Sequence, residues 1–479
     1  MPEGVITALL TLTLALPDGT VLTTPVELIG LAPQYQARFY WAWQAPDVAG
    51  LLPLTFTLTV PPDMPDPNPA DNTLTLTIPV YSTDDLYPPE PHTQWLTTEK
   101  EGFRLHTLTD SAATRDLPAL LDSAQDAYAD VAAQLPPAGD EILDIYLMDR
   151  VIGQGGFASA AWVAVSYTDR MYAPIQFDVV LRHELIHRLD KAIGCENAPS
   201  LIREGLAVYL PGGHYRRESL PHKAAAVAQS EVYVPLDALL DNFYVHQHEV
   251  SYTEAGMWVG YFVETYGWEG LETLCRAATG AEGDDAARLT AGTTALGAPD
   301  LVALEAAWLD WLSGVPITAD DTALLDVELR LMDTMRAYQR DYNLSAHFLE
   351  GILFDVAEAE RQGIVADFVR RPREPEAIAV ELLLALAQDA VRQGDAAETE
   401  AILAAITPIL EHGDFTPGLA ADVLALTRLA LERGYEPYRL TPTAEGYTLG
   451  VLDYANWPAL ELWQAVRENG NWKLVLGNE

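Results

Sequence analysis

Residues 181–190 read Leu181-Arg-His183-Glu184-Leu-Ile-His187-Arg-Leu-Asp190, an H-E-x-x-H pattern inside an apolar stretch. Residues four apart share one face of a helix, so both imidazoles can reach a single metal ion with Glu184 beside it. Apolar neighbours support a helix, and Gly194 is placed to end it. Two histidines and a carboxylate, with one coordination position left for water, are the donors of catalytic zinc sites, so the pattern predicts such a site.

A carboxylate for this site follows in Pro199-Ser-Leu-Ile-Arg-Glu204-Gly-Leu-Ala207. Small residues after Glu204 are expected to let this second helix approach the first closely. An H-E-x-x-H pattern alone arises by chance in roughly one or two chains in a hundred of this composition, and the second signal makes an accident the weaker explanation. We therefore predict that His183, His187 and Glu204 hold a Zn²⁺ ion.

The order of these motifs between about Trp95 and Leu274 resembles the gluzincin zinc metallopeptidases, specifically the bacterial peptidase-MA-like group. In that group a Pro-x-x-x-x-Glu-Gly-x-Ala helix supplies the third ligand, as residues 199–207 would here. A later helix of the group carries a tyrosine and ends in an aromatic-glycine turn, and residues 252–267 look similar. The resemblance implies a peptidase domain with a zinc cofactor and a peptide or protein substrate.

Two related patterns do not match. Metzincins carry a glycine and a histidine three and six positions after the second histidine, whereas Asp190 and Ile193 stand there. Thermolysin-like enzymes keep an acidic residue four positions after the third ligand, where this chain has Val208. The resemblance is therefore confined to the peptidase-MA-like pattern.

Catalytic roles follow from the chemistry of such sites. Glu184 is expected to act as the general base that takes a proton from the zinc-bound water. The oxyanion needs a second donor, which the resemblance places at Tyr252, with His246 and His248 as alternatives. A buried helix aromatic with a satisfied hydroxyl is the other interpretation of Tyr252.

Other polar residues leave alternatives open. Asp190 can orient a ligand imidazole, or it can form a salt bridge with Arg188, Lys191 or Arg203. Four histidines lie close in sequence but repeat no ligand spacing, so core or surface positions are expected rather than a second metal site: His214, His222, His246 and His248. Cys195 and Cys275 are compatible with one disulfide or with two buried thiols.

The composition of the chain limits its partners. At 479 residues the chain should form about three or four domains. The formal net charge of −42 repels phosphate backbones and anionic lipid, so we expect neither nucleic-acid nor membrane-surface partners. No apolar run reaches the roughly 18–20 residues of a membrane-spanning helix. No basic segment precedes the apolar run at Val5–Leu16, so we read no signal peptide within this chain. We nevertheless expect an extracytoplasmic protein, secreted or on the cell surface, whose export signal lies outside this chain.

The sequence predicts a multidomain fold. Residues 1–81 alternate Thr-, Val- and Leu-rich runs with turns, as in a β-sandwich, and the segment Val60–Asn72 resembles that of cell-adhesion-related bacterial immunoglobulin-like domains, with the first strands missing. Residues 82–316 are expected to form the α+β gluzincin-like domain, with residues 162–167 as an edge strand. Residues 317–434 read as helical. Residues 435–479 read as a small β-meander packed on the helical domain, with a hairpin at Asn469-Gly470.

An inert protein is the alternative function. In that interpretation a surface or binding protein retains a peptidase-like domain without activity, or the flanking domains dock a partner and proteolysis is secondary. A blocked cleft or a missing oxyanion donor would favour it.

Overall fold

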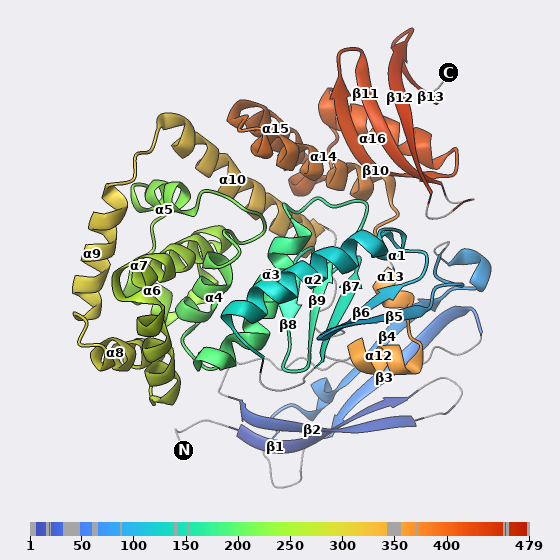
Figure 1. Ribbon diagram of the computed structural model, residues 1–479. Coiled ribbons are helices and arrows are strands. Elements are labelled where there is room, and N and C mark those ends of the chain that lie inside the picture. The colour runs from blue at the N-terminus through green and yellow to red at the C-terminus, as the bar shows by residue number, and fades with distance from the viewer. Residues whose placement is uncertain are drawn as a thin grey trace. The chain divides into compact units, whose positions relative to one another are not determined.

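The computed structural model describes residues 6–15, 19, 21–31, 48–59, 66–86, 89–137, 142–151, 153–342, 356–369, 371–453, 456 and 459–476. The chain divides into two compact units (Figure 1). One comprises Met1–Pro91 with Gly351–Gln362, and the other comprises His92–Glu350 with Gly363–Glu479. The three boundaries between the four domains expected from the sequence stay predictions.

The first unit contains a small antiparallel sheet. Its strands are β1 (Ile6–Ala15), β2 (Val21–Leu31), β3 (Gly50–Thr59) and β4 (Thr73–Val80), in the order β2-β1-β3-β4. Alternation of Thr with apolar residues at period two explains why β1, β3 and β4 are strands. The short helix α12 (Val356–Gln362) also belongs to this unit. The aromatic run at residues 38–43, which also reads as a strand, lies outside the described residues.

A five-stranded mixed sheet lies in the second unit. It contains β5 (Trp95–Lys100), β6 (Phe103–Leu108), β7 (Leu143–Met148), β8 (Gly156–Ala158) and β9 (Trp162–Ser166). The order is β5-β6-β7-β9-β8, with parallel pairing in the middle and antiparallel pairing at both edges. The expectation of an edge strand at residues 162–167 is wrong, because β8 pairs with the outer side of β9. Three residues are too few to give a strand pattern in the sequence.

Helices cover the rest of this unit. The helix α2 (Leu117–Gln134) connects β6 to β7, and α3 (Phe177–Leu189) packs against α2, β8 and β9. A short 3-10 turn, η3 (Asp190–Ile193), continues α3 and ends at Gly194, whose left-handed φ of 79° confirms the predicted stop. The remaining helical elements up to residue 313 are α1 (Ala112–Arg115), α4 (Ser200–Tyr209), α5 (Leu220–Ala228), α6 (Leu236–Asp241), η4 (Phe243–Val245), α7 (His248–Gly280), α8 (Asp285–Ala295) and α9 (Leu301–Ser313).

Small residues bring α4 against α7. A methyl group at Gly205 would lie 2.8 Å from the carbonyl carbon of Ala255, and one at Gly256 would lie 2.5 Å from Val208 Cγ1. The close approach allowed by Gly205 is therefore to α7, not to the H-E-x-x-H helix as expected. A disulfide between Cys195 and Cys275 settles the open alternative for these cysteines and ties the α3–α4 connection to α7.

The C-terminal part is helical and then β-stranded, as predicted. Its helical elements are α10 (Ala319–Ala337), the π-helix η5 (Tyr338–Tyr342), α13 (Ala366–Val369), α14 (Pro375–Arg392), α15 (Ala396–His412) and α16 (Leu419–Leu431). The meander consists of β10 (Tyr435–Thr443), β11 (Gly446–Asp453), β12 (Leu460–Glu468) and β13 (Asn471–Leu476) in sequential antiparallel order. Positive φ angles of 52° at Asn469 and 83° at Gly470 confirm the predicted hairpin. Figure 1 shows α16 against the meander, where it contacts β10 and β13.

A buried arginine fastens the C-terminal part to the central sheet. Arg170, which follows β9, forms ion pairs with Glu381 of α14 and Glu436 of β10. Its side chain is 1 % exposed, so loss of both carboxylates would leave its buried charge uncompensated. Among the described residues, no helix combines the length and apolarity that crossing a bilayer requires.

Candidate metal centre and its cleft

The histidines of the H-E-x-x-H pattern face each other on α3. His183 Nε2 and His187 Nε2 are 3.1 Å apart, as the helical spacing predicts. Both Nδ1 atoms are buried and have no hydrogen-bond partner among the described residues. The two Nε2 atoms are therefore directed at one point beside the helix.

Glu204 of α4 completes this group. Its Oε2 atom lies 3.4 Å from His183 Nε2 and 3.2 Å from His187 Nε2, and no described residue donates a hydrogen bond to it. Burial alone would raise the pKa of this carboxyl group, yet His187 and His183 hold the pKa well below its usual range. Glu204 is therefore ionised beside two imidazole nitrogens.

The spacing of the three donor atoms fits a tetrahedral metal ion. Zinc binds nitrogen and oxygen ligands at about 2.0–2.1 Å, which separates neighbouring ligand atoms by about 3.3 Å. The three observed separations lie between 3.1 and 3.4 Å. His183, His187 and Glu204 thus form a buried group that can hold a divalent ion.

Glu184 lies beside this group without belonging to it. The side chain is buried. Burial, opposed by His183 and aided by Glu204, raises its pKa to about 7. The absence of a side chain at Gly156 of β8 makes room for it, because a methyl group there would lie 2.8 Å from Glu184 Cγ. The edge strand therefore runs directly past a carboxyl group that can change its protonation state near neutral pH.

These residues line one cavity of about 420 Å³. It is bounded by the edge strand, by α3 and α4, and by residues from the loops and helices that follow. The lining residues are Gly155, Gly156, Phe157, Ala158, Val180, His183, Glu184, His187, Arg203, Glu204, His214, Tyr215, Tyr244, His248, Tyr252 and Arg336.

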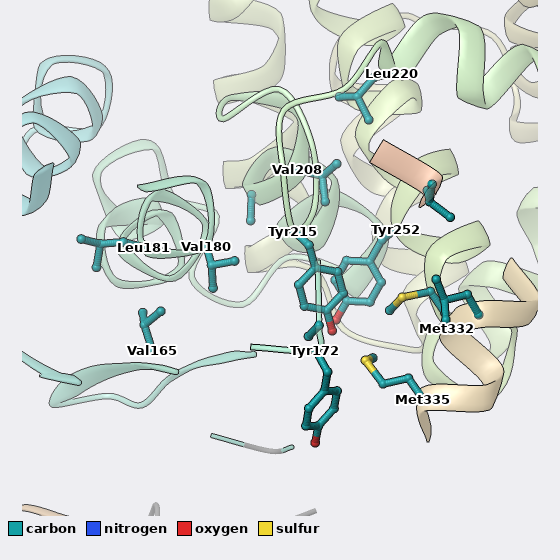
Figure 2. Packing of buried hydrophobic residues seen from close by; sticks show 14 of the residues in the cluster. Val165, Tyr172, Val180, Leu181, Val208, Tyr215, Leu220, Tyr252, Met332 and Met335 are labelled. Carbon is teal, nitrogen blue, oxygen red and sulfur yellow. The ribbon is translucent and has the colours of Figure 1, made fainter. Parts of the chain in front are cut away.

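Tyr252 of α7 lines this cavity. Its ring stacks on that of His214 at a centroid distance of 4.0 Å, and its hydroxyl has no hydrogen-bond partner among the described residues. Burial, followed by the charge of Glu204, raises its pKa well above the usual range, so the hydroxyl keeps its proton. In Figure 2 Tyr252 lies next to Tyr215, with α10 and its Met335 beside them.

A second histidine group adjoins the first. His214 Nδ1 is 2.8 Å from Glu249 Oε1, and His248 is close enough for the three to form another potential ligand group. Lys223 Nζ lies 3.3 Å from Glu249 Oε2 and is itself surrounded by Glu218 and Glu328. Both oxygens of Glu249 therefore already have cationic or N–H partners, which favours a hydrogen-bonded cluster over a second metal site.

Burial keeps these histidines neutral. It lowers the pKa of His248 to about 3, an effect to which His214 and Arg336 add. It also lowers the pKa of His214, although Glu249 opposes the shift. Their rings can thus donate or accept hydrogen bonds in the cleft without carrying charge at neutral pH.

The other expected site residues lie elsewhere. Asp190 Oδ2 accepts a bond from Arg203 Nε at 2.9 Å, so the observed contact is the salt bridge rather than one with an imidazole. His246 Nε2 lies 3.2 Å from the carbonyl oxygen of Ala238 and does not line the cavity. Of the two histidine alternatives to Tyr252, only His248 reaches the cleft.

No sequence motif predicts three further cleft residues. Tyr244 donates a 2.8 Å hydrogen bond to Glu204 Oε1 and so orients the carboxylate of Glu204. Tyr215 and Arg336 reach the cavity from a loop and from α10. None of the three belongs to a motif with fixed spacing, so only the path of the chain brings them to the site.

No model of a known protein family matches this sequence, and no curated protein matches it either.

Proposed function

We propose that this chain is a zinc-dependent metallopeptidase of the gluzincin type, with His183, His187 and Glu204 as ligands. The convergence of two Nε2 atoms and one carboxylate oxygen at mutual distances of 3.1–3.4 Å carries the proposal. Two histidines and a glutamate leave one coordination position for a water molecule. Zinc held there would polarise a peptide carbonyl and lower the pKa of its bound water.

Glu184 is the proposed general base. Its pKa of about 7 suits a group that takes a proton from water and then gives it to the leaving amine. Its burial also excludes bulk water from the proton transfer. The contact with Gly156 holds the carboxyl group between the ligand helix and the edge strand.

The negative charge that develops on the substrate carbonyl oxygen requires hydrogen-bond donors in the cleft. Tyr252 is the proposed donor, because its protonated hydroxyl lines the cavity and has no described partner. His248, which also lines the cavity and whose neutral ring can donate from one nitrogen, is a second candidate.

The substrate is proposed to bind as an added strand. β8 is an edge strand whose outer side borders the cavity, so its backbone can pair with an extended peptide. Phe157 and Ala158 continue the wall on one side of Glu184.

An extracytoplasmic location is part of the proposal. The Cys195–Cys275 disulfide supports it, because such bonds persist in oxidising compartments. The assignments of residues 1–81 as an immunoglobulin-like domain and of residues 82–316 as a peptidase domain also stay proposals, as does the lack of nucleic-acid partners.

The test is hydrolysis of a mixed peptide library by the full chain, with zinc content measured in parallel. We expect one equivalent of zinc in the wild type and in Glu184→Gln, with cleavage at least about 10³-fold slower in the variant because the proton acceptor is lost. Glu196→Gln removes an exposed carboxylate outside the cleft and serves as the control. Unchanged hydrolysis in Glu184→Gln would refute the mechanism, and a zinc-loaded wild type without activity would favour the inert alternative.

A further inference from the structure

Arg336 brings a positive charge from α10 into the cleft. It lines the same cavity as Glu184 and Glu204. The helix that carries it lies in the part of the sequence that we expected to form a separate helical domain. The C-terminal helices therefore contribute to the cleft itself.

The guanidinium of Arg336 is held in a fixed position. Its Nη2 donates to the hydroxyl of Tyr215 at 2.7 Å, and its Nη1 donates to Gln339 Oε1 at 2.9 Å. Gln339 is anchored in turn by a 3.1 Å bond from its Nε2 to the hydroxyl of Tyr172. A guanidinium group that is already held in one orientation loses little conformational freedom when it binds a ligand.

These contacts place Arg336 near the beginning of the edge strand. A methyl group at Gly155 would lie 4.0 Å from Tyr215 Cε1, and one at Gly153 would lie 2.6 Å from Gln339 Cδ. Gly156, the first residue of β8, packs against Glu184. Arg336 and its partners therefore lie upstream of the point where β8 passes the general base.

Antiparallel pairing is the commoner arrangement of neighbouring strands, and we take it for a peptide added to β8. Such a strand would run from Ala158 towards Gly156, so its residues beyond the scissile bond would approach Arg336. Arginine presents a planar fork that matches a carboxylate with two parallel hydrogen bonds.

We propose that Arg336 recognises a substrate carboxylate on the leaving-group side of the scissile bond. The carboxylate is either the free C-terminus of a short peptide or a Glu or Asp side chain, since the chemistry is the same. This inference rests on the proposed peptidase function and adds the substrate class. The structural alternative is that Arg336 only braces Tyr215 and Gln339.

The test uses four peptides that share one scissile sequence taken from the library experiment. The last residue is Glu or Gln, and the C-terminus is free or amidated. For the wild type we expect kcat/KM at least about tenfold higher for one carboxylate-bearing form than for the amidated Gln peptide, as charge-assisted hydrogen bonds allow. A preference lost on amidation identifies the terminal carboxylate, and one lost on changing Glu to Gln identifies the side chain.

Arg336→Gln should bring this ratio close to one, and Arg336→Lys, which keeps the charge without the fork, should leave an intermediate ratio. Arg340→Gln, four residues later and exposed, removes the same charge outside the cavity and should keep the wild-type ratio. A ratio cancels a general loss of activity, so a bracing role alone would not change it. No preference in the wild type, or an unchanged preference in Arg336→Gln, would overturn the proposal.

Binding separates this inference from the peptidase proposal. Calorimetry measures how tightly the zinc-loaded Glu184→Gln variant binds the four peptides. If the library is not cleaved, four peptides of one arbitrary sequence with the same Glu or Gln ends, free or amidated, take their place. A carboxylate preference in affinity that Arg336→Gln abolishes supports the inference even where no peptide is hydrolysed. Equal affinity for all four peptides overturns it, whatever the outcome for hydrolysis.

Discussion

Gly156 of β8 and Glu184 of α3 are packed so closely that a methyl group at position 156 would lie 2.8 Å from Glu184 Cγ and 2.8 Å from Val180 Cγ1. Gly156 has no positive φ angle, so its backbone would accept alanine. The glycine is therefore needed for the space it leaves rather than for its conformation. The edge strand and the proposed general base are fitted to each other.

Gly156→Ala should displace the carboxyl group of Glu184 while leaving the metal ligands in place. A misplacement of about 1 Å at a catalytic group costs on the order of 100-fold in rate, so kcat/KM for a cleaved peptide should fall by that order. Zinc content, measured by elemental analysis, should stay at the wild-type value. Gly280→Ala is the control, because a methyl group there meets nothing within 4 Å. Wild-type activity in Gly156→Ala would show that Glu184 does not need its observed position.

The ligand histidines could be predicted because their geometry is local. Helical periodicity alone directs His183 and His187 at one point, whatever surrounds the helix. Glu204 needed more, namely a connection of the right length and a resemblance to a known motif. Gly205 was expected to pack against the H-E-x-x-H helix. It packs against α7 instead, because α7, which lies further along the chain, covers the face of α4 that carries the glycine.

The residues of the cleft walls could not be predicted, because they too are brought together by packing between segments far apart in the chain. His214 and Tyr244 lie outside the regular helices that carry the ligand motifs, and Arg336 comes from a helix that reads as part of another domain. A three-residue edge strand has too little sequence to show a period. These positions depend on tertiary packing, which no spacing in the sequence encodes.

Glu204→Gln should weaken zinc binding while leaving the fold intact. The amide oxygen is a poorer ligand than the carboxylate, and loss of its negative charge beside two imidazoles should reduce affinity by roughly 100-fold or more. At a zinc concentration 100 times the wild-type Kd, binding adds about 2.7 kcal/mol to the stability of the wild type. Most of the zinc-dependent rise in Tm should therefore be lost. Glu249→Gln tests the neighbouring group: loss of zinc there, but not in Glu204→Gln, would place the metal with His214 and His248.

Tyr252→Phe should lower kcat with little change in KM. The variant removes only the hydroxyl that we propose to stabilise the developing charge, and loss of one such donor costs roughly 100-fold or more in kcat. Tyr261→Phe removes a hydroxyl from a buried tyrosine of the same helix outside the cavity and serves as the comparison. If both variants keep the wild-type kcat, the donor is not Tyr252, and His248→Ala becomes the decisive measurement.

The disulfide should contribute strongly to stability. Cys195 and Cys275 are both fully buried and are separated by 80 residues. A crosslink that closes a loop of this length restricts the unfolded chain by about 4 kcal/mol. We expect the double variant Cys195→Ala, Cys275→Ala to lose about that much in free energy of unfolding, measured with guanidinium under oxidising conditions. An unchanged midpoint would mean that the bond is absent from the protein in solution.

Glu254 of α7 should make stability depend on pH. Its side chain is almost fully buried; Oε1 accepts a 2.9 Å bond from the backbone N–H of Val234, and Oε2 has no hydrogen-bond partner among the described residues. Burial raises its pKa well above the usual value of 4.5, and Glu305 adds to the shift, while the Val234 bond opposes it. The folded protein thus binds this proton more tightly than the unfolded chain does. The stabilisation is complete below about pH 4.5 and is lost as the pH rises through the raised pKa.

Glu254→Gln keeps the bond to Val234 but stays neutral at every pH. It should therefore match the wild type near pH 4.5 and be more stable at pH 8, by about 1–3 kcal/mol, because the variant buries no charge. Thermal unfolding at the two pH values measures the difference, and Glu269→Gln, an exposed carboxylate on the same helix, is the control. An equal or lower Tm for Glu254→Gln at pH 8 would mean that a cation or a water molecule compensates the charge of Glu254 in solution.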